Sequence, residues 1–314
     1  MALRNVKEYI SKRMKEIVSA VGKKKALIAT SGGVDSVTCA VLTHKAIGKN
    51  AIVLFIDDGL MRQNEGQKVK KDMAKSGIKV KIMNVQADFF KALKGLEDPE
   101  EKRKAFRDTF YKSLGKAVRM TGASFMIQGT IAADIKETRA GVKTQHNVLQ
   151  QIGISPEKYG LRILEPLKDL YKFEVRMVAR ALGIQPEYSE RMPFPGPGLA
   201  TRVVGEVTPH RVATLRKATV IVEEEIKKAR IKPFQGFAVL LKDKATGVKK
   251  GKRAFGEIIV VRSVDSKNAI TAKVTRIPWK VLEKIQKRIN LEIPDVIKVL
   301  FDITPKPPST IEYI

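Results

Sequence analysis

A strand-length apolar run leads directly into a glycine turn and the start of a helix between Ala26 and Ser36. The run reads Ala-Leu-Ile-Ala-Thr-Ser-Gly-Gly-Val-Asp-Ser. Glycines let backbone N–H groups approach an anion, and the N-terminus of a helix adds a favourable partial charge. Serine hydroxyls can donate further hydrogen bonds to phosphate oxygens. The segment therefore predicts a phosphate-binding loop, formed by Ser31, Gly32, Gly33, Val34, Asp35 and Ser36, after the first strand of a parallel sheet.

An acidic residue in this loop indicates a bound cation. The Asp35 carboxylate would repel phosphates unless Mg²⁺ lay between them, so Asp35 is the candidate metal ligand. The loop lacks the Gly-Lys-Ser/Thr ending of the common nucleoside triphosphatase loop. Without that lysine, it suits holding a pyrophosphate leaving group. The alternative is a turn that only connects strand to helix, but the Ser and Asp residues at fixed offsets disfavour it.

Strands and helices alternate through the first two thirds of the chain. Short apolar runs of strand length occur at residues 26–30, 51–57, 80–85, 124–128 and 162–164. Helical patterns cover residues 2–21, 36–47, 65–76, 100–121 and 173–182. Repeated strand–helix units predict an α/β fold, with a twisted parallel sheet covered by helices on both faces.

A second domain is predicted after the segment Pro193–Gly198, where three prolines interrupt both helix and central strand. We place the boundary there and expect domains 1–192 and 193–314. Beyond the boundary, helices are expected at residues 209–229 and 279–290, with strands at 234–241, 257–264, 269–276 and 296–303. This order predicts a compact α+β unit.

The chain is strongly basic, with 60 Lys and Arg against 33 Asp and Glu and a net charge of +27. Such a charge indicates anionic partners, or the lysine-rich surface of a heat-adapted protein. The basic residues are spread along the chain, so we expect no nucleic-acid partner. The single cysteine, Cys39, excludes an intrachain disulfide and fits a reducing cytoplasm. No apolar run approaches the roughly 20 residues that span a bilayer, so no membrane partner is expected.

The Ser-Gly-Gly-Val-Asp-Ser loop resembles the pyrophosphatase loop of the N-type ATP pyrophosphatases, an adenine nucleotide α-hydrolase-like fold. Four further blocks resemble the GMP synthetase family in particular: residues 55–62, 128–130, 193–199 and 306–313. The resemblance implies the synthetase subunit of the two-subunit type, which uses ATP and Mg²⁺ to adenylate xanthosine monophosphate (XMP). Ammonia would come from a separate glutamine amidotransferase subunit, and the C-terminal domain would form a homodimer.

The resemblance also implies roles for individual residues. Leu54, Phe55 and Ile56 would border the adenine, and Gly129 and Thr130 would help to close the nucleotide site. Lys306 would bind the XMP phosphate, and Glu312 would accept hydrogen bonds from purine N–H groups. The remaining XMP candidates are Arg103, Arg202, Gln235, Thr310 and Ile311.

Residues 133–147 resemble the family's mobile lid. Within it, Lys143 would stabilise charge that develops during adenylation, while Asp134, Glu137 and His146 would orient groups or move protons. The sequence departs from the family pattern at Gln145, where a histidine is common, and at Tyr313 and Ile314 in the tail.

Two other functions stay open at this point. NAD synthetase shares the loop, but the Pro-Phe-Pro-Gly-Pro-Gly block and the Lys-Pro-Pro tail have no place in it. A tRNA-modifying or RNA-binding protein would explain the charge of +27. Thiolating members of that class need reactive cysteines, which Cys39 alone does not supply.

Overall fold

The computed structural model describes residues 5–132, 134–135, 162–267 and 269–314. The chain forms two compact units. The first comprises Met1–Asp58, Asn64–Val85 and Asp108–Arg191, and the second comprises Gly59–Gln63, Gln86–Arg107 and Met192–Ile314. The chain enters the second unit for the last time at Met192, next to the predicted boundary. Two earlier segments also belong to the second unit. The division at Pro193 therefore stays a prediction.

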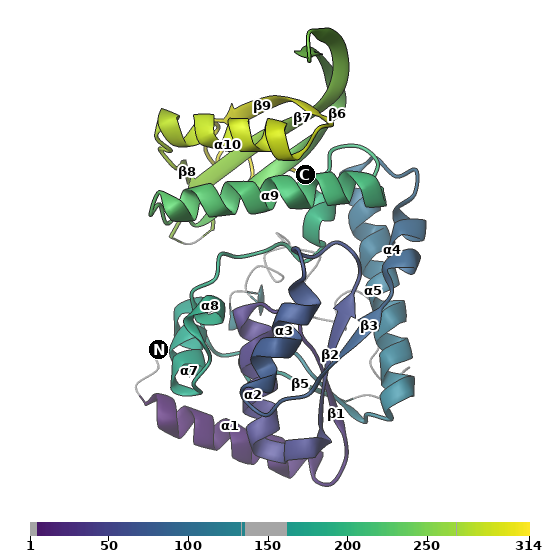
Figure 1. Cartoon of the computed structure of the whole chain (residues 1–314). Coiled ribbons are helices and arrows are strands. Elements are labelled where there is room, and N and C mark those ends of the chain that lie inside the picture. The colour runs from purple at the N-terminus through teal and green to yellow at the C-terminus, as the bar shows by residue number, and fades with distance from the viewer. Residues whose placement is uncertain (1–4, 133, 136–161, 268) are drawn as a thin grey trace. The chain divides into compact units, whose positions relative to one another are not determined.

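The first unit contains a five-stranded parallel sheet in the order β3-β2-β1-β4-β5 (Figure 1). Its strands are β1 (Ala26–Ala29), β2 (Ala51–Asp57), β3 (Val80–Asn84), β4 (Phe125–Ile127) and β5 (Arg162–Leu164). Successive strand residues point to opposite faces of a sheet, yet Ala26, Leu27 and Ile28 are all buried. Both faces of the sheet are therefore covered, and the predicted α/β class is confirmed.

Helices surround this sheet. They are α1 (Val6–Val21), α2 (Val34–Ile47), α3 (Glu65–Ala74), the greater part of α5 (Pro99–Thr121), α7 (Lys172–Ala181) and α8 (Pro186–Ser189), with the short 3₁₀ helix η1 (Gly48–Asn50). Asn5 caps α1 by accepting a hydrogen bond from the Glu8 N–H at 3.2 Å, and Gly22 ends it at a positive φ of 57°. Helices α1, α2 and α7 pack against one another.

The strand order places a topological switch beside β1. The chain leaves β1 towards β2 and β3, then returns to β4 on the opposite side of β1. Connections that depart in opposite directions leave a crevice at the carboxyl ends of the two strands, where ligands bind in open α/β sheets. Residues that follow β1 and β4 therefore occupy the expected ligand position.

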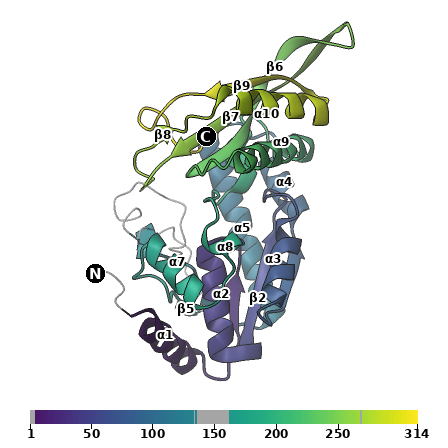
Figure 2. The ribbon, with the colours of Figure 1, turned by 60° about the vertical axis from the view of Figure 1, so that its left-hand side comes forward.

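The second unit is built on a long antiparallel hairpin, β6 (Gln235–Lys249) and β7 (Lys252–Asp265). Two further strands pair with β7: β8 (Lys273–Val274) antiparallel and β9 (Val296–Asp302) parallel. Helix α9 (Pro209–Lys228) packs on β6 and on α10 (Trp279–Glu292), and α4 (Gln86–Leu93) and the 3₁₀ helix η4 (Gly198–Arg202) complete the unit. The predicted α+β class is confirmed, but α4, η4 and the outer half of the hairpin (Figure 2) are not predicted by the sequence.

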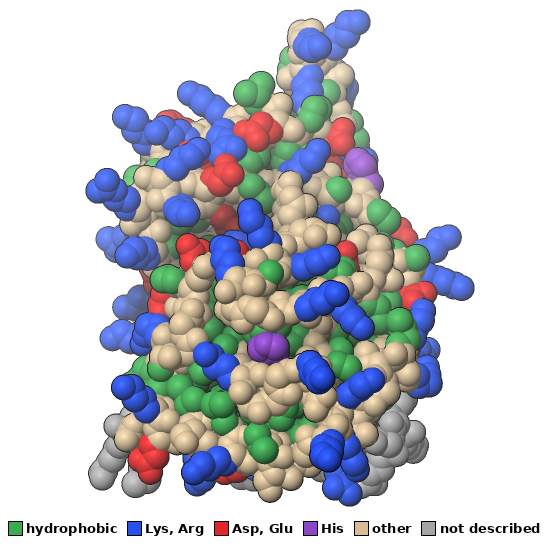
Figure 3. Space-filling model, turned by 60° about the horizontal axis from the view of Figure 1, so that its bottom comes forward, with side chains coloured by type: hydrophobic (Ala, Val, Ile, Leu, Met, Phe, Trp, Pro, Cys, Tyr) green, Lys and Arg blue, Asp and Glu red, His purple; other side chains and the backbone are tan. Residues whose placement is uncertain are grey.

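Lysine and arginine side chains are distributed over the whole face that Figure 3 shows, without gathering in one patch. Within the described part of the chain, no helix combines the length and apolarity needed to cross a membrane.

Candidate active site

The predicted phosphate loop follows β1 and leads into α2. Thr30 closes the strand with a hydrogen bond from its N–H to the Leu54 carbonyl oxygen at 2.8 Å. The Ser36 hydroxyl lies at the centre of the loop: it donates to the Gly33 carbonyl oxygen at 3.0 Å and accepts from the Ser31 N–H at 3.2 Å. Gly33 is the N-cap of α2 and has no capping side chain. The first N–H groups of α2 therefore lack a side-chain cap and suit an anion.

Gly32 is the most constrained residue of the loop. Its φ is +77°, and a Cβ there would lie 2.8 Å from Val69 Cγ2 and closer still to Glu65 Oε1. Glu65 is buried and binds both terminal nitrogens of Arg191, one of which also donates to the Gly32 carbonyl oxygen at 3.3 Å. This ion pair fixes the loop against α3, in a way that only glycine permits.

Asp35 lies in the first turn of α2. Its Oδ2 accepts a hydrogen bond from Lys172 Nζ at 2.5 Å, while its Oδ1 is buried without a hydrogen-bond partner among the described residues. Burial raises the pKa of the Asp35 carboxyl, and the Lys172 ammonium opposes this rise. A buried carboxylate oxygen without a donor is costly unless a ligand or cation satisfies it. The geometry fits a cation at Oδ1.

The other predicted nucleotide residues line the same edge of the sheet. Leu54, Phe55 and Ile56 are buried in β2, which continues three residues beyond its last partner in β1. Gly129 approaches the loop so closely that a Cβ would lie 3.1 Å from the carbonyl carbon of Asp35. Thr130 is fully buried and donates to Glu165 Oε1 at 2.6 Å. The structure thus brings together all of the nucleotide-site residues predicted from the sequence.

A second cluster lies within the second unit and centres on Glu312. Arg202 donates from Nε to Glu312 Oε2 at 2.8 Å and from Nη2 to Glu312 Oε1 at 2.9 Å, and Gln235 Nε2 donates to Oε1 at 3.0 Å. The Arg202 side chain is only 2% exposed, and its guanidinium lies over the rings of Phe237 and Phe194, at 3.8 Å and 5.1 Å from their centroids. Three of the predicted XMP residues therefore meet, with Arg202 and Gln235 both bound to Glu312.

The C-terminal tail is held by a buried arginine that the sequence analysis missed. Arg262 has no exposed surface and donates to the carbonyl oxygens of Ile311 at 2.9 Å, Thr304 at 3.1 Å and Thr310 at 2.5 Å. Its remaining partner is the Asp302 carboxylate. The tail is therefore anchored through its backbone, which leaves the exposed Thr310 side chain and the partly exposed Glu312 at the surface.

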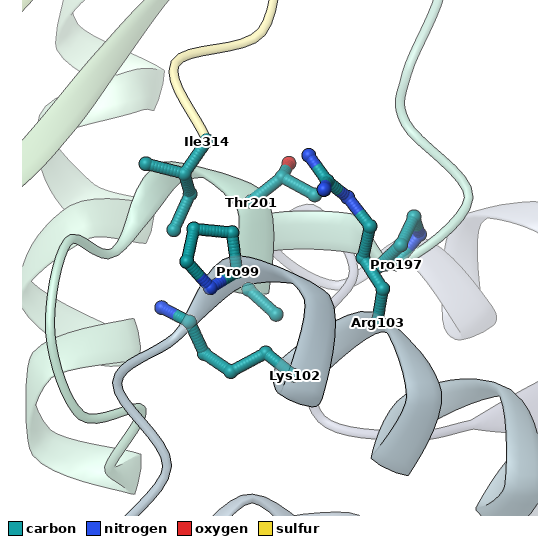
Figure 4. Close-up of a pocket in the computed structure, with 7 residues that line it drawn as sticks. Pro99, Lys102, Arg103, Pro197, Thr201 and Ile314 are labelled. Atoms are coloured by element: carbon teal, nitrogen blue, oxygen red, sulfur yellow. The ribbon is translucent and has the colours of Figure 1, made fainter. Parts of the chain in front are cut away.

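The two predicted phosphate-binding cations occupy different surroundings. Lys306 is partly exposed, and its Nζ donates to the Ala269 carbonyl oxygen at 2.8 Å. Arg103 pairs with Glu100 and lines a small pocket together with Lys102 and Thr201 (Figure 4). Among the described residues, Lys306 is not part of the lining of this pocket. The two side chains therefore contact different groups.

The lid residues are only partly visible. Glu137, Lys143 and His146 lie outside the described residues. Asp134 is described, and its Oδ2 accepts a hydrogen bond from the Ile131 N–H at 3.0 Å. This bond ties Asp134 to the segment that follows Thr130.

Several residues of the two clusters had no role assigned from the sequence. Lys172 and Arg191, which bind Asp35 and Glu65, lie in segments without a readable motif. Phe194 lies in the proline-rich block, which predicts a domain boundary and resembles a family motif but indicates no role for this ring. Its ring forms cation–π contacts with two guanidinium groups. That of Arg62 lies 4.3 Å from the ring centroid and that of Arg202 lies 5.1 Å from it. The composition of this block could have suggested such an anchor.

Comparison with known proteins identifies the family of the chain. The model of the PP-loop domain matches residues 6–187, and that of the GMP synthase C terminal domain matches residues 223–313. A protein of Methanopyrus kandleri that is named as one of the subunits of glutamine-hydrolyzing GMP synthase is 49% identical over 98% of each chain. The proteins of the same name from Pyrococcus furiosus and Archaeoglobus fulgidus are each 48% identical, over 98% of this chain and 97% and 99% of theirs. The chain therefore belongs to this family of glutamine-hydrolyzing GMP synthase subunits, as its sequence motifs predict.

Proposed function

We propose that this chain is the synthetase subunit of a two-subunit GMP synthase. It adenylates XMP with ATP and then exchanges the activated oxygen for ammonia, giving GMP, AMP and pyrophosphate. The observation that carries the proposal is that one chain contains both sites. It has a phosphate loop at the topological switch beside β1, and it has the Glu312 cluster.

The loop side chains and backbone hold the triphosphate. The uncapped N–H groups at the start of α2 bind phosphate oxygens, and the Ser31 and Ser36 hydroxyls add hydrogen bonds. The adenine lies against the carboxyl end of β2 at Leu54–Ile56, where this strand continues beyond β1. The loop has no lysine of the kind that binds the γ-phosphate in nucleoside triphosphatases. It instead binds the pyrophosphate that leaves when the α–β bond breaks.

Asp35 fits the magnesium ion that this chemistry needs. Its buried Oδ1 lacks a donor among the described residues, and Mg²⁺ in nucleotide sites takes one or two carboxylates together with substrate phosphates. When bound, the ion neutralises charge on the phosphates. Among the described residues no group of three or more His, Cys, Asp or Glu forms a metal site, which fits an ion held largely by its substrate.

Glu312 selects the base. With both oxygens oriented by Arg202 and Gln235, the carboxylate accepts hydrogen bonds from the N–H groups of the xanthine ring. Arg103 and Lys306 provide positive charge for the phosphate of XMP. Thr310 and Ile311 shape the tail around the base.

Chemistry starts when the C2 oxygen of XMP attacks the α-phosphate of ATP and the α–β bond breaks. Ammonia then attacks C2, loses a proton, and AMP leaves with the former C2 oxygen. Lys143 stabilises charge on the adenylated oxygen, and Asp134, Glu137 and His146 orient groups around it. These lid roles rest on the family resemblance.

The partner is a glutamine amidotransferase subunit that supplies the ammonia. The relatives are named as one subunit of their enzyme, which supports a partner chain. We further propose a cytoplasmic homodimer formed through the second unit. Nucleic acid has no part in this function, although the charge of +27 keeps RNA binding as a competing outcome.

A product assay tests the proposal. Incubation with XMP, Mg-ATP and ammonium should yield equal amounts of GMP, AMP and pyrophosphate, because the α–β bond is the one broken. Glutamine alone should support little turnover, and added ammonium should restore it. ADP and phosphate as products would rule the mechanism out. Turnover of nicotinate adenine dinucleotide would favour NAD synthetase, and tight RNA binding without reaction of XMP would favour the RNA-binding alternative.

A further inference from the structure

A buried lysine lies next to the pocket of Arg103, and no part of the proposed reaction uses it. Lys102 lies in the first turn of α5 and is 3% exposed. Its Nζ donates to the carbonyl oxygens of Val203 and Gly205, each at 2.8 Å. A lysine ammonium carries three donors and is rarely buried without a charged partner. No carboxylate forms an ion pair with Lys102 in the described part of the chain, so two carbonyl oxygens are its fixed partners.

The carbonyl partners of Lys102 connect two parts of the XMP site. Val203 directly follows Arg202, whose guanidinium holds Glu312. Arg103 directly follows Lys102 on α5. The Lys102 ammonium therefore joins the helix that carries Arg103 to the backbone that carries Arg202.

Lys102 also lines the pocket that Arg103 borders. The other lining residues are Pro99, Pro197, Ala200, Thr201 and Ile314. Figure 4 shows Lys102 and Arg103 on neighbouring positions of the helix, with the Arg103 guanidinium beside Thr201. A phosphate bound by Arg103 at the mouth of this pocket would lie near Lys102, whose charge acts strongly through low-dielectric surroundings.

The charge on Lys102 changes close to neutral pH. Burial lowers the pKa of its ammonium to about 8, and the nearby Arg211 and Arg103 act in the same direction. The Glu97 and Asp98 carboxylates oppose this shift. At pH 7 the side chain is therefore mostly charged, and at pH 9 it is mostly neutral.

We propose that Lys102 is a positioning residue of the XMP site, which holds Arg103 and Arg202 at their working distance and adds positive charge behind the phosphate. The proposal rests on the function proposed above. It adds a pH dependence to XMP binding: affinity is full when Lys102 is charged and falls when it becomes neutral. ATP binding, which depends on the loop of the first unit, is unaffected.

Direct binding of XMP without ATP tests this idea. Titration calorimetry of the full chain at pH 7 and pH 9 should show that the dissociation constant for XMP rises about fivefold to tenfold in the wild type. Lys102→Arg keeps its charge at pH 9, so it should lose this rise. Lys102→Met should bind XMP at pH 7 at least as weakly as the wild type does at pH 9, because it loses both hydrogen bonds as well as the charge. Lys104→Met, which removes an exposed charge two residues away, should behave like the wild type.

The outcomes separate this proposal from the proposed function. Wild-type protein that binds XMP equally well at both pH values would overturn the role of Lys102 and leave GMP synthesis intact. The same conclusion would follow if XMP affinity depended on pH equally in the wild type and in Lys102→Arg. Such a shared dependence would come from ionisation of XMP, which affects both proteins. Wild-type protein that neither binds XMP nor makes GMP would overturn both. ATP binding and circular dichroism report whether each variant is folded.

Unfolding provides a second measurement that needs no ligand. The pKa of Lys102 is about 8 in the folded chain and about 10.4 in an unfolded one. Between these values the unfolded state binds more protons, so the stability of the wild type should rise with pH relative to Lys102→Met. Circular dichroism during urea unfolding measures the stability of both proteins. A constant difference between the two proteins from pH 8 to pH 10 would contradict the buried ammonium.

Discussion

Arg202 shows how a family position can act through another residue. The resemblance implies that it contacts XMP, yet its side chain is 2% exposed and its fork is occupied by Glu312. Phe194 and Phe237 stack on its guanidinium and keep it in place. An arginine fork on a carboxylate fixes both oxygens in one plane. We therefore propose that Arg202 orients Glu312 and that Glu312 contacts the purine.

This arrangement predicts a specific pattern of mutant effects. Arg202→Lys keeps the positive charge but loses the fork, so the dissociation constant for XMP should rise about tenfold to a hundredfold. Glu312→Gln should cause a similar loss. Because the two residues act as one unit, the double variant should bind XMP no worse than the weaker single variant. Calorimetric titration of all three proteins measures this.

The control for the pair is Arg119→Lys, an equally conservative change at an exposed site on α5. It should leave XMP affinity unchanged. If the losses of the two single variants simply add in the double variant, Arg202 contacts XMP independently of Glu312. ATP affinity should stay at the wild-type value in every variant.

At the scale of elements, the phosphate loop depends on contacts from α3 and from the segment after α8. The Glu65–Arg191 pair lies against Gly32, whose φ of +77° and lack of a side chain permit this approach. The loop is therefore a local motif whose shape is set by residues far away in the sequence. Its glycine serves both the backbone conformation and the packing.

Gly32→Ala separates these requirements. The methyl group would meet Glu65 and Val69, so the loop should shift, and the Michaelis constant for ATP should rise at least tenfold. Gly22→Ala is the matched control: its φ is +57°, but nothing lies within 4 Å of the added carbon. It should carry the backbone strain alone and leave ATP kinetics unchanged. Equal effects of both substitutions on ATP kinetics would show that the loss does not arise from the contacts of Gly32.

The same scale shows what the sequence can predict. The loop, β1 and α2 follow from local signals, because apolar run, glycines and helix start are adjacent. The hairpin of β6 and β7 is predicted only to Leu241 and from Glu257, since residues 242–256 are rich in lysine and glycine and lack alternating apolar residues. Helix α4, only eight residues long, is missed. Partners such as Arg202 and Glu312, separated by 110 positions, come together only through the fold.

At the scale of the whole molecule, the outer hairpin of the second unit exposes apolar side chains. Phe255 pairs with Thr246, and Arg253 with Val248, so their side chains share one face. Val248 is 76% and Phe255 71% exposed. An isolated two-stranded ribbon is marginally stable in water, and exposed apolar side chains grouped on one face are typical of contact surfaces. This face supports the proposed homodimer.

Charge on the same ribbon predicts how a dimer responds to salt. Residues 246–255 contain four basic side chains and no acidic one: Lys249, Lys250, Lys252 and Arg253. Two copies that meet here repel each other electrostatically while their apolar side chains are buried. Salt screens this repulsion, so the dimer should become tighter as ionic strength rises. An acidic partner protein on the same face would show the opposite dependence.

Replacing the apolar pair tests the dimer directly. The double variant Val248→Ser and Phe255→Ser should move the mass measured by light scattering from twice 35.0 kDa to 35.0 kDa, with unchanged circular dichroism. Met120→Ser, at a methionine of the first unit that is 71% exposed, should leave the dimer intact. A wild-type monomer at all salt concentrations would refute the homodimer, and a dimer that survives the double substitution would place its interface elsewhere. Because the hairpin lies in the unit that holds Glu312, loss of the dimer should weaken XMP binding only if the second copy supports that site.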